Sequence, residues 1–233
     1  MERRRIYLMR HGETLYQRVA NEGAIGNGAL TERGREQIAT TALLFRAVRL
    51  DRIYSSPLSR SHETARIIAD ETGLEVSLDP DLAEITPSEE LTASQDLTDI
   101  FRAVQRFFTS PTTGWDEPYL GGESFRQVRQ RTERFLRGVL AQADWRTLLA
   151  VAHGGSNNAL LASVLGITDG RVFNIEQDFG CINIIDFADD RPMLRLTNFT
   201  LYDQLKVKLW DHSLDIILNL LHERGVIQKD RLP

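Results

Sequence analysis

Short apolar segments that favour β-strands alternate along this chain with segments of helical periodicity, and this alternation constrains the fold most. Strands joined by helices form a largely parallel sheet, because each helix carries the chain back across a face of the sheet. The sequence therefore predicts an α/β fold of three layers, in which a mostly parallel central sheet has helices on both faces. The expected strands cover about 4–9, 51–56, 75–78, 147–152, 181–187 and 193–199, and the expected helices about 31–49, 59–72, 91–108, 125–139 and 154–165.

The domain organisation follows from length and from the even composition of the chain. A chain of 233 residues can form one large domain or two small ones, and no linker-like segment divides this one. We predict a single domain, 1–233, with an insertion at about 85–122 that forms a helical cap over the strand ends. A helical tail at about 200–233 is expected to pack on the sheet or to pair subunits in a homodimer.

Composition excludes several classes of function. The formal net charge of −5 and the lack of a sustained basic stretch argue against nucleic acid as a partner. Cys181 is the only cysteine, so the chain can form neither an intrachain disulfide nor a cysteine-based metal site. No segment reaches the roughly 18 apolar residues that a membrane span requires, and no signal-like segment follows the first Met. We therefore expect a cytoplasmic protein with no membrane partner.

Cationic side chains follow three of the predicted strands. Arg10 and His11 come directly after the first strand, Arg60 lies at the start of the helix after the second, and His153 precedes two glycines after the strand 147–152. Carboxyl ends of parallel strands meet at one edge of a sheet, where ligands bind. Arginine can form two hydrogen bonds to phosphate, helix N-termini favour anions, and a neutral histidine can be a nucleophile. Each residue alone has an ordinary structural explanation, but together they predict a pocket for a phosphate dianion.

Five motifs occur in a set order between about residues 4 and 187. They are Arg10-His11-Gly12-Glu13-Thr14, Leu30-Thr31-Glu32-Arg33-Gly34, Ser55-Ser56-Pro57-Leu58-Ser59-Arg60 continuing to Thr64-Ala65, Gly121-Gly122-Glu123-Ser124, and Val151-Ala152-His153-Gly154-Gly155. With these motifs the chain resembles the histidine phosphatase superfamily, also called phosphoglycerate mutase-like. The resemblance implies that His11 is the nucleophile and forms a phosphohistidine, and that Arg10, Arg60 and His153 hold the phosphoryl oxygens.

A leaving alkoxide also needs a proton, which requires a carboxylic acid that faces His11. In the family this acid is commonly a Glu after the third strand, and Glu84 lies there in this sequence, with Glu89 or Glu90 as alternatives. The chain departs from the family at position 17, where an Asn that contacts phosphate is common and the longer Gln17 stands here. The segment 85–90 also replaces the usual Gly-x-Trp-Glu-Gly type of stretch, which concerns the substrate pocket more than the phosphoryl site.

The resemblance and the residues together predict a phosphomonoesterase that acts on a small-molecule phosphate monoester through a phosphohistidine. No metal and no other cofactor are expected, since no Asp, Glu or His cluster has ligand spacing. One alternative is a phosphoglycerate mutase, although the extra basic and proline-rich segments of the cofactor-dependent mutases have no clear counterpart here. The other is a non-catalytic module that binds a phosphorylated ligand, which predicts the loss of a catalytic side chain.

Overall fold

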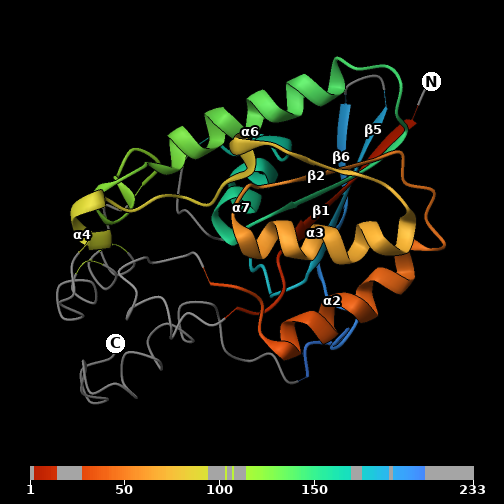
Figure 1. Cartoon of the computed structure of the whole chain (residues 1–233). Coiled ribbons are helices and arrows are strands. Elements are labelled where there is room, and N and C mark those ends of the chain that lie inside the picture. The colour runs from red at the N-terminus through yellow and green to blue at the C-terminus, as the bar shows by residue number, and fades with distance from the viewer. Residues whose placement is uncertain are drawn as a thin grey trace.

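The structure is a computed structural model that describes residues 3–14, 28–93, 103, 107, 114–168, 175–188 and 191–207. Strands and helices alternate along it, as the sequence predicts (Figure 1). In chain order the elements are β1 (Arg3–Arg10), α2 (Glu32–Phe45), β2 (Arg52–Ser55), α3 (Ser59–Thr72), β3 (Val76–Leu78), the 3-10 helix η1 (Pro80–Leu82), α4 (Glu89–Ala93), the 3-10 helix η2 (Tyr119–Gly121), α6 (Phe125–Leu140), β4 (Thr147–Ala152), α7 (Gly154–Val164), β5 (Ile182–Ala188) and β6 (Arg191–Phe199).

One six-stranded sheet runs through the described part of the chain, in the order β3-β2-β4-β1-β5-β6. The four strands from β3 to β1 are parallel, and β5 and β6 are antiparallel to their neighbours. The predicted α/β fold with a mostly parallel sheet is confirmed. The central place belongs to β4, which enters between β2 and β1 although both precede it in the sequence.

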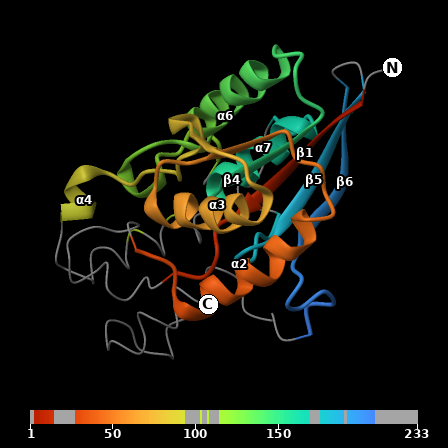
Figure 2. The ribbon, with the colours of Figure 1, turned by 45° about the vertical axis from the view of Figure 1, so that its right-hand side comes forward.

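Side chains of β4 alternate between two apolar cores, because successive residues of a strand point to opposite faces of the sheet. Leu148 and Ala150 pack with residues of α6 and α7 on one face, whereas Leu149 and Val151 pack with residues of α2 and α3 on the other. Figures 1 and 2 show the two helix pairs, α6 with α7 and α2 with α3, lying together in space. Burial of both faces explains why β4 is apolar along its length.

Polar caps and a glycine define where these helices begin and end. The side chain of Thr31 accepts a hydrogen bond from Gly34 N at the start of α2, at 2.8 Å, as a capping threonine does. Ser124 and Gln127 form a capping box at the start of α6. Gly73 ends α3 with a φ of 71°, in the left-handed region that a glycine enters without strain.

The predicted cap lies partly outside the described residues. The expected loop at 79–87 contains η1, and α4 begins at Glu89, two residues before the expected start of the helix 91–108. Within 94–113, only residues 103 and 107 are described, and both are helical. Trp115 is buried and its ring meets that of Phe125 at 5.0 Å between centroids, which places this part of the insertion in an apolar cluster beside α6.

Residues 201–207 form turns and bends, with Lys206 at a φ of 56° and its Nζ bonded to Asp178 Oδ2 at 2.8 Å. Residues 208–233, where most of the expected helical tail lies, are outside the described residues. The boundaries of the single domain, of the cap and of the tail stay predictions. Among the described residues no helix has the length and apolarity to cross a membrane.

Two apolar side chains on α2 test the core on this face of the sheet. Ile38 is fully buried and Leu43 is 50% exposed. We expect Ile38→Ala to lower the free energy of unfolding by about 2–5 kcal/mol, because it leaves a cavity, and Leu43→Ala to change it by less than about 0.5 kcal/mol. Urea denaturation of both variants measures the difference, and equal losses would contradict the assignment of the core.

Candidate functional site

The register of three parallel strands brings the predicted residues together. Arg10 lies opposite Ala152 in the pairing of β1 with β4, and Ser55 lies opposite Val151 in the pairing of β2 with β4. The pairing continues past the strand ends, since His11 N donates to Ala152 O at 3.1 Å. His153 therefore lies between the end of β1, which carries His11, and the end of β2, from which α3 starts.

His11 has one ring nitrogen fixed and the other directed at a cation. Its Nδ1 lies 2.8 Å from Gly12 O, and because a carbonyl oxygen only accepts, Nδ1 is the nitrogen that carries the proton. The lone pair of the neutral ring is then on Nε2, which accepts a hydrogen bond from Arg60 Nε at 3.1 Å. The ring is 1% exposed. His11 thus presents an unprotonated nitrogen toward a guanidinium that can hold an anion in front of it.

His153 faces the same pocket from β4. Its ring centroid lies 5.1 Å from that of His11, and its Nε2 meets Ser56 Oγ at 2.8 Å and Ser61 Oγ at 3.3 Å. A serine hydroxyl can donate or accept, so these contacts suit either form of the ring. The other nitrogen, Nδ1, is buried with no hydrogen-bond partner among the described residues.

Arg10 is held by a backbone carbonyl and an aromatic ring, and buried polar side chains fix the residue that supplies the carbonyl. Its guanidinium donates to Gln177 O and lies over the ring of Phe179, with 4.1 Å from Cζ to the ring centroid. The amide of Gln177 is fixed in turn by Asn183 and Asn157, whose Nδ2 atoms lie 2.8 and 3.1 Å from Gln177 Oε1. These hydrogen bonds fix the position of the Gln177 segment that holds the guanidinium.

Burial and the arginines keep both imidazoles neutral. Desolvation lowers the pKa of His11 well below its ordinary value of 6.5, and the positive charges of Arg60 and Arg10 lower it further. The pKa of His153 is lowered well below 6.5 by the same burial, and then by Arg60 and its other cationic neighbours. At neutral pH the pocket therefore holds two guanidinium cations and an available lone pair on His11.

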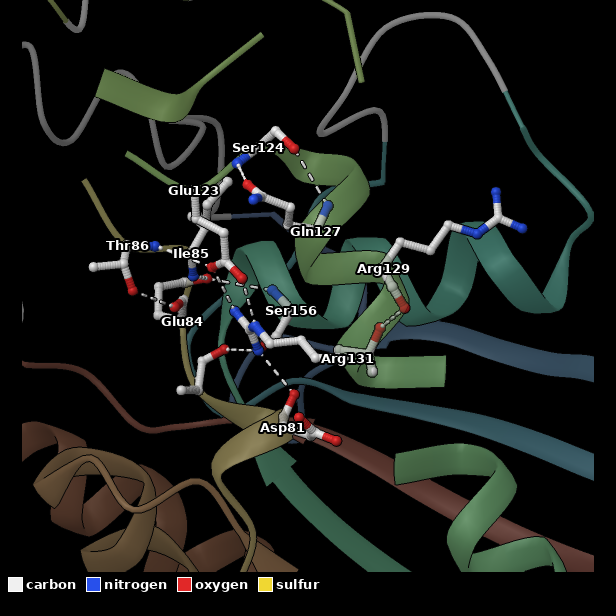
Figure 3. Close-up of polar contacts among 12 residues, drawn as sticks. Asp81, Glu84, Ile85, Thr86, Glu123, Ser124, Gln127, Arg129, Arg131 and Ser156 are labelled. Atoms are coloured by element: carbon white, nitrogen blue, oxygen red, sulfur yellow. Dashed lines mark hydrogen bonds and ion pairs between the residues drawn. The ribbon is translucent and has the colours of Figure 1, made fainter. Parts of the chain in front are cut away.

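Glu84 lies at the start of α7, one residue beyond the 3-10 helix and Ala83. Its carboxylate accepts hydrogen bonds from Ser156 N at 3.3 Å and from its neighbour Ile85 N at 2.9 Å (Figure 3). It also accepts one from Gly155 N at 3.3 Å. The amides of Gly155 and Ser156 lie in the first turn of α7, the helix that His153 directly precedes. A Cβ added to Gly155 would come within 2.4 Å of Glu84 Oε1, which is why this approach requires a glycine.

The structure does not place the other predicted site residues with the histidines, Arg10, Arg60 and Glu84. Glu89 and Glu90 are exposed on α4, whereas Glu84 is half-buried. Gln17 lies outside the described residues. Among the residues that the structure describes, no three His, Cys, Asp or Glu side chains gather in a group that could hold a metal ion.

Several residues of the site were not found by sequence reasoning. Ser56, Ser61, Gln177 and Asn157 hold the histidines and Arg10, yet each occurs in an ordinary loop or helix pattern. Asn157 offered a signal, because it stands beside a second asparagine in an otherwise apolar helix and buried amides require partners.

Comparison with known proteins gives matches over most of the chain. The model of the histidine phosphatase superfamily (branch 1) matches residues 6–200. The adenosylcobalamin/alpha-ribazole phosphatase of Salmonella typhimurium is 29% identical over 200 residues, 83% of this chain and 96% of that protein. A protein of Enterobacter sp. named probable phosphoglycerate mutase is 31% identical over 163 residues, 70% of this chain and 75% of its own. The solved structure of a mycobacterial glucosyl-3-phosphoglycerate phosphatase with VO3 has a TM-score of 0.64 and 26% identity, and the match covers 84% of this chain and 99% of that one.

Burial of the two neutral histidines predicts that acid destabilises the fold. In the unfolded chain a histidine has a pKa of about 6.5, so below that pH the unfolded state binds more protons than the folded state. We expect the free energy of unfolding to fall as pH drops from 7 to 5, with His11 and His153 each contributing at most about 1.4 kcal/mol per pH unit. Urea denaturation at pH 7, 6 and 5 in a phosphate-free buffer measures this dependence.

The matched control is the double variant His11→Gln and His153→Gln. The carboxylates whose pKa values are lowered, Asp51, Asp116, Glu133 and Asp186, lose their contribution at lower pH, so they do not produce a slope in this window. An equally steep loss of stability in the double variant would show that other groups cause it.

Proposed function

The chain belongs to the histidine phosphatase superfamily, and we propose that it is a metal-independent phosphomonoesterase that acts on a small phosphorylated metabolite through a phosphohistidine. The observation that carries the proposal is the state of His11. Gly12 O holds the proton of the ring on Nδ1, so Nε2 offers its lone pair where Arg60 can place a phosphoryl group.

In the first step the dianion binds between Arg10, Arg60 and His153, which face the phosphoryl oxygens. Charge stays on those oxygens throughout transfer, so fixed cations in a buried pocket stabilise the transition state. His11 Nε2 attacks phosphorus, the bond from phosphorus to the leaving oxygen breaks, and the proton stays on His11 Nδ1, hydrogen-bonded to Gly12 O. The product of this step is a phosphohistidine at His11 and an alkoxide that needs a proton.

We assign that proton to Glu84. As a carboxylic acid it gives its proton to the leaving oxygen, and as a carboxylate it then takes a proton from the water that attacks phosphorus. The bond from phosphorus to Nε2 breaks in this second step, which returns neutral His11, inorganic phosphate and protonated Glu84. The position of Glu84 beside the residues that follow His153 supports this role, and the exposure of Glu89 and Glu90 argues against them.

A mutase is the second candidate, and the match to the Enterobacter protein favours it. Both activities share the phosphohistidine and differ in which molecule receives the phosphoryl group. Incubation with 3-phosphoglycerate separates them, because a phosphatase releases inorganic phosphate and a mutase forms 2-phosphoglycerate. The cytoplasmic location and the homodimer stay predictions from the sequence.

The role of His11 is tested with p-nitrophenyl phosphate in the presence of EDTA. We expect turnover by the native protein, a loss of at least about a thousandfold in His11→Ala, and an acid-labile phosphoryl group on the native protein after rapid quenching. Release of p-nitrophenol and transfer of radioactive phosphate measure both. Turnover that requires added metal would overturn the mechanism, and no turnover of any phosphate monoester would favour the non-catalytic module.

The place of Glu84 is tested by two adjacent glycines. In Gly155→Ala the new methyl group collides with Glu84 Oε1, whereas a Cβ on Gly154 finds its nearest atom, Arg10 Cζ, at 3.7 Å. We expect Gly155→Ala to lower kcat by about 10–100-fold through displacement of the carboxylate, and Gly154→Ala to stay within about threefold of the native value. Similar kcat values for the two variants would contradict the assignment of Glu84.

A further inference from the structure

The segment that carries Glu84 is held on both sides by one ion pair. Arg131 of α6 and Glu123 lie side by side, with Arg131 Nε 2.8 Å from Glu123 Oε1 and Nη2 3.0 Å from Oε2. Their side chains are only 11% and 19% exposed. Planar pairing through two parallel hydrogen bonds is the strongest geometry for an arginine and a carboxylate.

Arg131 uses its remaining nitrogen on the chain just before Glu84. Its Nη1 donates to Asp81 O at 2.8 Å and to Ala83 O at 2.7 Å, the carbonyls at the end of η1 (Figure 3). Carbonyls at the end of a helix carry partial negative charge and need donors. The guanidinium therefore fixes the residue immediately before Glu84.

Glu123 holds the chain just after Glu84. Its backbone N donates to Thr86 O at 2.8 Å, and its carboxylate lies 3.4 Å from Thr86 N. A Cβ on Gly122 would come within 2.2 Å of Thr86 O, so the backbone at Gly122 packs against the backbone at Thr86 with no room for a side chain between them. The bonds to Ala83 and Thr86 thus bracket the two residues Glu84 and Ile85.

We propose that the Arg131 clamp, formed by Arg131 and Glu123 on the backbone of Asp81, Ala83 and Thr86, is the positioning device for the general acid Glu84. Arg131 bonds to Glu123 and to the backbone before Glu84, and Glu123 bonds to the backbone after Ile85, so the pair acts on Glu84 through the backbone. A misplacement of about 1 Å of a catalytic group can cost a hundredfold in rate. This inference rests on the proposed function, because it assigns Arg131 to the proton-transfer step.

The test uses the dependence of rate on the leaving group. We compare kcat/KM, which reports the steps through release of the leaving group, for phenyl phosphate and 2,4-dinitrophenyl phosphate. A phenoxide needs a proton as it leaves and a dinitrophenoxide does not. In Arg131→Met we expect kcat/KM to fall by about 10–100-fold with phenyl phosphate and by less than about threefold with 2,4-dinitrophenyl phosphate.

Three further variants complete the experiment. Glu84→Gln should show the same selectivity, and Arg131→Met should add little to it in the double variant, because both changes remove one function. Arg131→Lys cannot form the fork and should recover only part of the loss. The control is Arg134→Met, which removes an exposed guanidinium of α6 that pairs with the Asp81 side chain at 2.7 Å, and it should leave both rates unchanged.

Inhibition by inorganic phosphate reports whether the phosphate pocket is intact. If Arg131→Met binds phosphate normally and loses rate equally on both substrates, or loses none, the positioning role is overturned. If it no longer binds phosphate, Glu123→Gln, which keeps the guanidinium, decides by the same comparison of substrates. Failure of the native protein to hydrolyse either substrate would instead overturn the proposed function, so the two failures are distinguishable.

Discussion

Buried positive charge at the carboxyl edge of the sheet governs how the rest of the site is built. Arg10 and Arg60 are 5% and 3% exposed, and a buried cation is costly unless oriented polar groups surround it. A backbone carbonyl and an aromatic ring hold Arg10, and the Nε of Arg60 rests against the lone pair of His11. The neighbouring imidazoles stay neutral because further positive charge there is unfavourable. The same positive charge makes the pocket suited to a dianion and keeps the imidazole of His11 neutral.

The precision of this arrangement comes from strand pairing rather than from contacts among the charged groups themselves. Parallel pairing with β4 sets the ends of β1 and β2 level, so that His11 and Ser56 both lie next to the histidine that follows β4. A slip of one residue would turn every side chain of β4 to the opposite face, exchanging the two apolar cores. Burial of both faces of β4 therefore protects the alignment of the arginines and histidines at the strand ends.

Much of the fold could be predicted from the sequence. Strands buried on both faces are short continuous apolar runs, whereas amphipathic helices repeat apolar residues every three or four positions. The two arginines and two histidines of the pocket could be predicted for a related reason: each follows a strand, and ligands bind at the strand ends of a parallel sheet. Arg131 could not. It is one of several arginines along α6, and what distinguishes it is the carbonyls of a 3-10 helix about 50 residues earlier in the chain. The hydrogen-bond network that holds Gln177 beside Arg10 could not be predicted for the same reason, since Gln177 and Asn183 acquire their partners only in the folded sheet.

The insertion of β4 between two earlier strands also has a consequence for biosynthesis. Until the chain has grown through β4 and α7, β1 and β2 have no shared neighbour, and each presents unpaired backbone groups and an apolar face. Contacts between segments so distant in the sequence form late, which slows folding. A polypeptide that stops before residue 147 would thus lack the anion pocket and would expose the unpaired edges of β1 and β2. Premature termination would therefore produce aggregates rather than a weakly active fragment.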